Sequence, residues 1–158
     1  MPVIELRTEI KVPRPIVFDL SRSIDLHLLS TQQTHEKAIA GKTQGLMGLG
    51  EWVTWRAKHF GVYQQLTSHI TEMEPPHFFV DEMVAGAFNR FRHEHHFQES
   101  PYGTLMVDLF DYTSPLGMLG KLADFLFLKK YMTTLLAERN RVLKEVAESD
   151  KWKDLLVR

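Results

Sequence analysis

The stretch that decides the fold is residues 89–112, which read NRFRHEHHFQESPYGTLMVDLFDY. Apolar and polar residues alternate on both sides of the turn signal Pro101-Tyr102-Gly103. Alternation of this kind is typical of half-buried strands, and a short connection that contains glycine is typical of a hairpin. We therefore expect antiparallel strands over Asn89–Glu99 and Thr104–Tyr112.

The first of these strands carries two histidines on its apolar face, because Phe91, His93, His95 and Phe97 share one side. With the turn at Ser100–Gly103 setting the register, the expected opposite pairs are Phe97 with Met106, His95 with Asp108, His93 with Phe110, and Phe91 with Tyr112. The same argument across Gly86 pairs Met83 with Phe91, Asp81 with His93, and Phe79 with His95. Directly opposed residues have Cβ atoms about 5 Å apart, so each histidine acquires an aspartate.

Outward from this hairpin, the chain shows further strand and helix signals without a repeat or a linker. Proline and serine mark the starts of two short helices, one from Pro15 to about Ser21 and one capped by Ser23. A cap and first turn at Ser114-Pro115 open a long amphipathic helix to about Ala147. The other expected strands are Val3–Val12, Thr34–Ala40, Glu51–Phe60, Val62–Thr71 and His77–Ala85.

This order favours an α+β fold in which one antiparallel sheet covers the long helix. Three motifs make the resemblance specific: Gly45-Leu46-Met47-Gly48-Leu49-Gly50-Glu51, Phe91-Arg92-His93-Glu94-His95-His96-Phe97 and Ser114-Pro115-Leu116-Gly117. With the element order, they resemble the SRPBCC superfamily, also called START or Bet v 1-like. Its bacterial single-domain members, similar to polyketide cyclase/dehydrase-like proteins, are the nearest match, and the likeness covers nearly the whole chain.

The resemblance implies a helix-grip fold: a curved antiparallel sheet of about seven strands around a C-terminal helix, with two short helices after the first strand. It also implies one ligand-binding domain over residues 1–158. Members of the superfamily use a deep cavity between sheet and helix for lipids, sterols, polyketides or other hydrophobic molecules, and a minority are enzymes.

Composition excludes several classes of protein. The 158 residues carry 19 basic and 20 acidic side chains, which gives no basic excess for nucleic acid or an anionic membrane. The absence of cysteine removes disulfides, thiolate nucleophiles and thiolate metal sites. No signal peptide and no apolar run long enough to span a bilayer are found. We expect a cytoplasmic protein without stable membrane insertion; its oligomeric state stays open.

Inward-facing positions give the candidate ligand contacts. Asp81, His93, His95 and Asp108 form a polar group in an otherwise apolar wall, where they either orient a ligand or satisfy one another in the sheet. The same four are the candidates for acid–base catalysis, although no nucleophile motif such as Gly-x-Ser-x-Gly is present. The full expected lining is Trp55, Phe79, Asp81, Met83, Phe91, His93, His95, Phe97, Met106, Asp108, Phe110 and Tyr112.

The sequence also contains a candidate metal-ligand pattern, a glycine-rich loop and an apolar segment. His-x-His with an aspartate resembles a two-histidine, one-carboxylate metal set, but spacing alone is weak support, so we expect no metal and no cofactor. The loop Gly45–Gly50 is either a hinge at the cavity mouth or an ordinary turn. The segment Leu116–Leu128 either admits ligand, docks a partner or is buried at the sheet edge. No role is assigned to His27, His35, His59, His69, His77 and His96.

The leading hypothesis is therefore binding or transport of a small hydrophobic molecule. A cyclase or dehydratase acting in the same cavity is the first alternative. A regulatory partner-binding module is the second alternative, and it would have a filled core instead of an open cavity.

Overall fold

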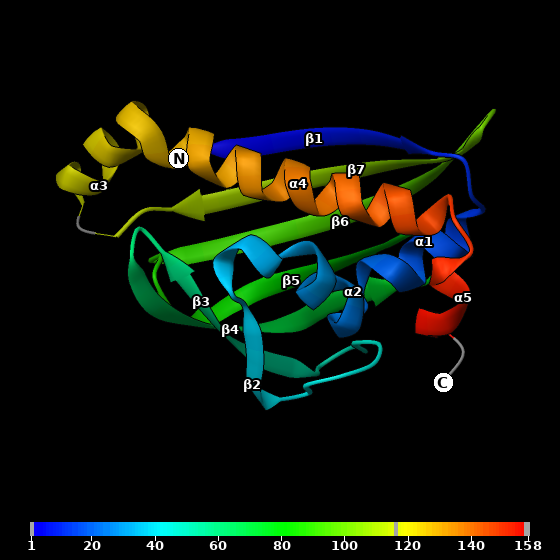
Figure 1. Ribbon diagram of the computed structural model, residues 1–158. Helices are drawn as coiled ribbons and strands as arrows, with labels where there is room; N and C mark the ends of the chain where they lie inside the picture. The colour runs from blue at the N-terminus through cyan, green and yellow to red at the C-terminus, as the bar shows by residue number, and fades with distance from the viewer. Residues whose placement is uncertain (1, 116, 157–158) are drawn as a thin grey trace.

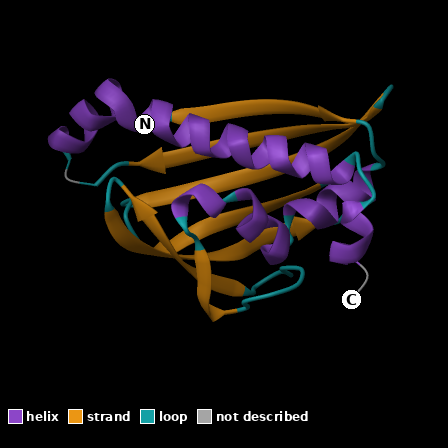
Figure 2. Ribbon diagram, viewed as in Figure 1, coloured by secondary structure: helices purple, strands orange, loops and turns teal. Residues whose placement is uncertain are grey.

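The computed structural model describes residues 2–115 and 117–156, and its main feature is one antiparallel sheet of seven strands. The strands follow the order β1-β7-β6-β5-β4-β3-β2, so each strand after β2 pairs with its neighbour in sequence and β1 closes onto β7. Figure 2 shows the sheet curved, with the helices on one side of it. The strands are β1 Val3–Ile10, β2 Lys37–Gly41, β3 Trp52–His59, β4 Val62–Glu74, β5 Phe78–Ala85, β6 Arg90–Ser100 and β7 Gly103–Thr113.

The register around β6 agrees with the sequence prediction. All four expected pairs between β6 and β7 are present, including His95 opposite Asp108. Asp81 lies opposite His93 and Phe79 opposite His95 in the β5–β6 ladder. That ladder ends at Glu82 opposite Arg92, so the pair Met83–Phe91 lies beyond it.

The curvature of the sheet is associated with irregularities in β4. This strand is three residues longer than predicted, and its pairing with β5 shifts between Thr67 and Ser68 and again between Ile70 and Glu72. Such bulges bend a strand and increase its twist. The bent β4 thus lets the sheet wrap around what lies on its inner face.

The two short helices form as the sequence predicts, as α1 (Arg14–Ser21) and α2 (Ile24–Ser30). Ser23 Oγ accepts a hydrogen bond from the Leu26 amide at 3.1 Å, which satisfies a free amide of the first turn of α2. The predicted strand start at Thr34 is wrong, because Gln32–Thr34 form the short helix η1 and β2 begins at Lys37. Side-chain bonds from Thr31 and Thr34 to backbone carbonyls hold this stretch in a turn.

The C-terminal helix differs from its prediction in start and continuity. It begins with α3 (Met118–Ala123), passes through one π-helical turn, η2 (Asp124–Leu128), and continues as α4 (Lys129–Ala147). The predicted start at Ser114-Pro115 is too early, since Gly117 has φ +56°, a left-handed conformation outside a right-handed helix. Leu116 lies outside the described residues.

A last short helix, α5 (Lys151–Leu156), was not predicted. Six residues give too short a pattern to recognise helical periodicity. Trp152, Leu155 and Leu156 of α5 pack against the main core. Figure 1 shows α5 beside α1, at the end of the sheet opposite α3.

The core is divided into two apolar clusters. The larger one lies around α1, with Phe18, Phe79 and Phe97 in edge and stacked ring contacts. The smaller one includes Phe91, Phe110 and Tyr112, with Met132 and Leu136 of α4 packed against it. The candidate site lies along α4, where these clusters meet.

Candidate functional site

A cavity of about 340 Å³ lies between the sheet and α4. Its walls are mainly apolar and include Trp55, Leu66, Phe91, Phe110, Met132 and Leu136. A second cavity of about 110 Å³ shares Trp55, Asp81, His93 and Arg139 with the first. The two hollows therefore meet at a polar wall formed by β5, β6 and α4.

The structure places only part of the expected lining around these cavities. Trp55, Asp81, Phe91, His93 and Phe110 line the large one, while Phe79 and His95 line the small one. Of the remaining expected residues, none lines either of the two cavities. Phe97 and Met106 pack in the main core, Tyr112 and Met83 belong to the smaller cluster, and Asp108 lies behind the histidines.

Asp108 organises the polar wall from behind. One carboxylate oxygen, Oδ1, accepts a hydrogen bond from His93 Nε2 at 3.0 Å, and the other accepts one from Asn140 Nδ2 at 2.7 Å. His95 Nδ1 lies 3.1 Å from Oδ1, an ion-pair contact that is not aligned as a hydrogen bond. Burial would raise the pKa of Asp108, but its contacts with the two histidines outweigh burial and hold that pKa well below its ordinary value.

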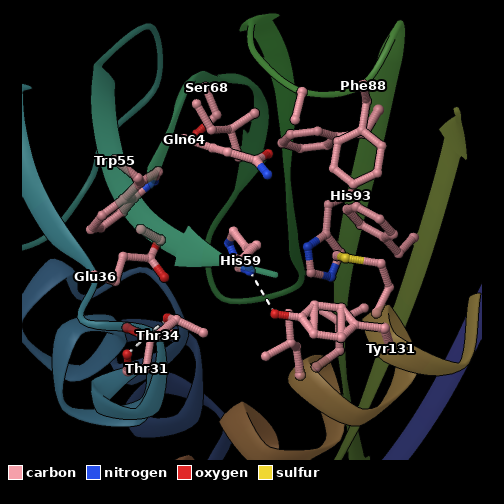
Figure 3. Close-up of a pocket in the computed structure, with 18 of the residues that line it drawn as sticks. Thr31, Thr34, Glu36, Trp55, His59, Gln64, Ser68, Phe88, His93 and Tyr131 are labelled. Atoms are coloured by element: carbon pink, nitrogen blue, oxygen red, sulfur yellow. Dashed lines mark hydrogen bonds between the residues drawn. The ribbon is translucent and has the colours of Figure 1, made fainter. Parts of the chain in front are cut away.

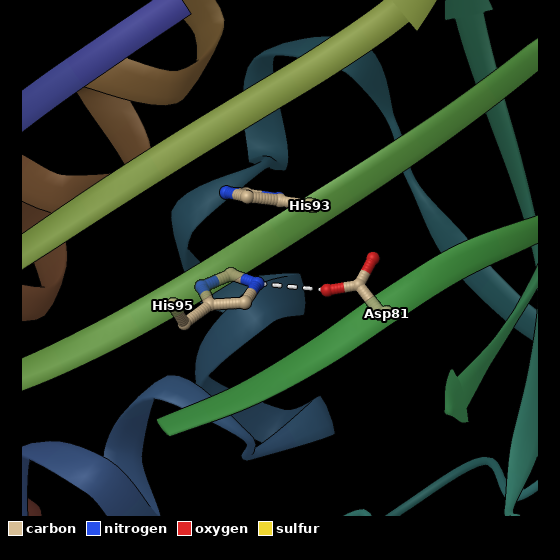
Figure 4. Close-up of side chains that lie close together, drawn as sticks. All are labelled: Asp81, His93 and His95. Atoms are coloured by element: carbon tan, nitrogen blue, oxygen red, sulfur yellow. Dashed lines mark hydrogen bonds and ion pairs between the residues drawn. The ribbon is translucent and has the colours of Figure 1, made fainter. Parts of the chain in front are cut away.

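His95 lies between two carboxylates. Its Nε2 is 2.7 Å from Asp81 Oδ2 (Figure 4). Its ring stacks on Phe79 with centroids 4.2 Å apart. Burial lowers the pKa of His95, whereas Asp108 and Asp81 raise it, and the net shift is upward. The pKa of Asp81 is lowered, because the interaction with His95 outweighs the opposing effect of burial. His95 is thus disposed to carry the positive charge of this group.

The pKa of His93 is shifted in the opposite direction, downward. Burial and the neighbouring charge of His95, whose ring centroid is 3.8 Å away, lower its pKa and favour the neutral ring. The Asp108 carboxylate accepts from Nε2, which assigns the proton to Nε2 and leaves a lone pair on Nδ1. His93 also lines both cavities (Figure 3), so a neutral imidazole stands at the polar wall.

Arg139 completes this wall from α4, and the sequence analysis missed it. Its guanidinium donates to the Ser21 carbonyl at 2.9 Å and lies 3.8 Å from Asp108, with the residue 8% exposed. One side of α4 carries residues at i, i+3, i+4 and i+7 spacing, namely Leu136, Arg139, Asn140 and Leu143. The polar pair between two leucines could have indicated that Arg139 and Asn140 face the sheet. We call Asp81, His93, His95, Asp108 and Arg139 the inner cluster; with His95 protonated, two carboxylates balance two cations.

A second polar group lines the large cavity, although no role was assigned to its histidines. His27 Nε2 lies 3.0 Å from Glu36 Oε1, and His59 Nδ1 lies 2.7 Å from the Tyr131 hydroxyl (Figure 3). The exposed Phe60 ring packs at a tilt against Tyr131 with centroids 4.5 Å apart, which places this group nearer the solvent. We call His27, Glu36, His59 and Tyr131 the outer cluster; distant sequence positions give no signal that they meet.

The charges of the outer cluster are set by burial and by its own pairs. Burial raises the pKa of Glu36, but His27 and, more weakly, His59 outweigh it and lower that pKa. Burial lowers the pKa of His59 and raises that of Tyr131. The outer cluster therefore presents an ionised carboxylate together with a neutral histidine and a neutral phenol.

A metal ion would have one donor set here. Asp81, His93 and His95 each bring a ligand atom within 4.8 Å of the other two. His95 Nε2 is bonded to Asp81 within this set, and His93 Nε2 is bonded to Asp108 outside it, so that a metal ion would have to replace the first bond and use Nδ1 of His93. The expectation of no metal stays a prediction.

The structure describes the Gly45–Gly50 loop and most of the segment 116–128, for which the sequence left alternatives open. The Gly45–Gly50 loop is hydrogen-bonded to the helices, through Met47 N to the Arg22 carbonyl and Gly45 N to Asp25. Met47 is buried beside the small cavity, and Leu49 is exposed. Of the alternatives for Leu116–Leu128, burial at the sheet edge is wrong for the described side chains, since Met118, Leu119, Leu122, Leu126 and Phe127 are exposed. None of the helices in the described ranges is long and apolar enough to span a bilayer.

Comparison with known proteins gives structural matches only. No family model matches the sequence, and no curated protein matches it. The protein TTHA0849 of Thermus thermophilus superimposes with a TM-score of 0.74 at 18% identity, over 91% of this chain and 95% of the other.

Two further structures are similar as well. Ginseng major latex-like protein 151 from Panax ginseng gives a TM-score of 0.69 at 13% identity, over 94% of this chain and 98% of the other. Ara h 8.0201 gives 0.60 at 11% identity, over 90% and 97%. These matches span almost the full length of both aligned chains, and this chain therefore has the Bet v 1-like helix-grip fold.

Proposed function

We propose that the protein binds a small, largely apolar molecule in the large cavity beneath α4. The observation that carries this proposal is the cavity itself, about 340 Å³ in volume and lined mainly by apolar and aromatic side chains. Ligand sites of proteins typically have this size and a few well-placed polar groups. The Bet v 1-like fold supports the same proposal, since the fold provides the space between sheet and helix.

The inner cluster would orient the polar end of the ligand. His93 and Arg139 line the large cavity and are fixed by Asp108 and Ser21. Because the charges of the cluster balance, a neutral hydroxyl or carbonyl group fits there better than an ion. A module that only binds protein partners would be expected to have a filled core, so the open cavity favours the ligand.

A second candidate function is acid–base catalysis by His93. The observation in its favour is the Asp108–His93 hydrogen bond, which leaves a neutral ring with a lone pair on Nδ1 at the cavity wall. A buried aspartate that orients a histidine in this way is a common arrangement for a general base. The readout is exchange of the α-hydrogens of 2-tetralone with D₂O, followed by NMR. His93-dependent exchange supports this function, and equal exchange with His93→Gln contradicts it.

The binding proposal is tested by mass spectrometry and by a fluorescent probe. The purified protein is weighed under native conditions and again after denaturation and solvent extraction, and it is also titrated with 1-aminoanthracene. We expect a small apolar molecule to be released, or the empty protein to bind the probe. The matched variant is Leu135→Trp, which fills the cavity from α4 and should abolish binding. Absence of both a released molecule and probe binding contradicts the proposal, as does unchanged binding by a folded Leu135→Trp variant.

A further inference from the structure

We infer that the ligand is an elongated, neutral molecule with a hydroxyl-type group at each end, one end held by the inner cluster and the other by the outer cluster. This inference rests on the proposed function and adds the class of ligand. It assigns a binding role to four residues, His27, Glu36, His59 and Tyr131, that come from α2, the segment before β2, the end of β3 and the start of α4.

The two clusters are separated along one helix. Tyr131 of the outer cluster and Arg139 of the inner cluster are eight residues apart on α4, which corresponds to about 12 Å along the helix axis. Met132, Leu135 and Leu136 lie between them and line the same cavity. On the side of the cavity formed by α4, a molecule that fills this space therefore meets polar groups near both ends and apolar side chains between them.

An entirely apolar ligand would cost the outer cluster hydrogen bonds, and a polar group at the end of the ligand would replace them. The Glu36 side chain is 12% exposed, and its carboxylate is held by His27 at 3.0 Å. A ligand that fills the cavity displaces the remaining water from this wall. A methyl group placed there would leave the carboxylate and the phenol with fewer hydrogen bonds, whereas a hydroxyl would replace the lost water.

The chemistry of the outer cluster also selects the type of group. The Glu36 carboxylate accepts hydrogen bonds and repels anions. The Tyr131 hydroxyl is hydrogen-bonded to His59, and Thr34 and Gln64 also line the cavity (Figure 3). Such a wall fits a donor such as a hydroxyl and disfavours a carboxylate. Trp55, whose ring is tilted against His27 with centroids 4.2 Å apart, gives this end an aromatic side wall.

The test compares two probes that differ only at one end, 1-decanol and 1,10-decanediol, as competitors of bound 1-aminoanthracene. Their affinities are measured for the wild type, for Tyr131→Phe and for Glu36→Leu. Tyr63→Phe is the matched control, because Tyr63 is half-exposed on β4 outside the two described cavities. Circular dichroism establishes that each variant is folded.

We expect the second hydroxyl to be accepted by the wild type and rejected by the variants. The ratio of diol affinity to alcohol affinity should fall about tenfold in Tyr131→Phe and in Glu36→Leu, and it should stay constant in Tyr63→Phe. An unchanged ratio in both variants overturns the inference while leaving ligand binding intact, since both alcohols still displace the probe. If the wild type binds neither the probe nor the alcohols, the proposed function fails and the inference fails with it.

Discussion

At the scale of single residues, Asp108 determines how the polar wall is arranged. It is 1% exposed and contacts His93, His95 and Asn140, which come from two different elements. A buried carboxylate with this many partners is fixed in position, and it fixes its partners in turn. The orientation of both histidines at the cavity wall depends on this one side chain.

Removing the charge of Asp108 should therefore be costly. We expect Asp108→Asn to lower the free energy of unfolding by about 3 kcal/mol, because a buried ion pair loses one partner and the other stays buried. Urea unfolding followed by tryptophan fluorescence measures this change. Asp111→Asn on the same strand is the control, since Asp111 pairs with Arg90 at the surface and should contribute less than about 1 kcal/mol. Equal effects of both variants would contradict the buried network.

The raised pKa of His95 gives a pH dependence of known sign. The folded protein binds this proton more tightly than the unfolded chain, so the stabilisation is complete below the ordinary value of 6.5 and is lost as pH rises through the folded pKa. We expect the difference in unfolding free energy between wild type and His95→Gln to shrink as pH rises above the ordinary histidine value of 6.5. Urea unfolding across this range measures it, and a difference that grows with pH would contradict the assignment.

Residue-level prediction succeeds where short-range geometry decides and fails where helix docking decides. His95 and Asp108 could be placed opposite each other because strand alternation and a short turn fix the register. Arg139 and Asn140 could not be placed beside them, because the rotation of α4 over the sheet depends on packing. The outer cluster, which includes Glu36 and His59, could not be predicted either, because its residues come from elements that are distant in sequence.

At the scale of elements, α4 packs in the core near its C-terminal end and borders the cavity nearer its start. Leu143, near its C-terminal end, is fully buried in the main core, whereas Leu135 is half-buried and borders the cavity. The start of the C-terminal helix was mispredicted because Ser114-Pro115 has the sequence of a helix start while Gly117 takes a left-handed conformation. Strand positions were predicted better, since their alternation extends over many residues.

This division of α4 predicts unequal costs of truncation. We expect Leu143→Ala to lower the free energy of unfolding by about 2–5 kcal/mol, because it opens a void in a packed core. Leu135→Ala should cost less than half as much, since the side chain already borders empty space and loses fewer contacts. Chemical unfolding of both variants tests this, and similar losses would show that the cavity is filled in solution.

At the scale of the whole molecule, an open cavity couples ligand binding to stability. A compound that binds only the folded state adds about 2.7 kcal/mol at a concentration one hundred times its Kd. We expect 1-decanol to raise the melting temperature of the wild type and to leave that of Leu135→Trp unchanged, as measured by calorimetry. An equal rise in both proteins would point to a binding site elsewhere.

The sheet remains open, so its two outer strands have consequences for self-association. Unpaired strand edges can recruit strands from other molecules. On β1 the exposed side chains include Glu5, Arg7 and Glu9, and on β2 the strand is only five residues long with a register shift between Ala38 and Ala40. The charged side chains of β1 and the short, irregular backbone of β2 make both edges poor templates for pairing with another strand. This should protect the folded protein from edge-to-edge aggregation.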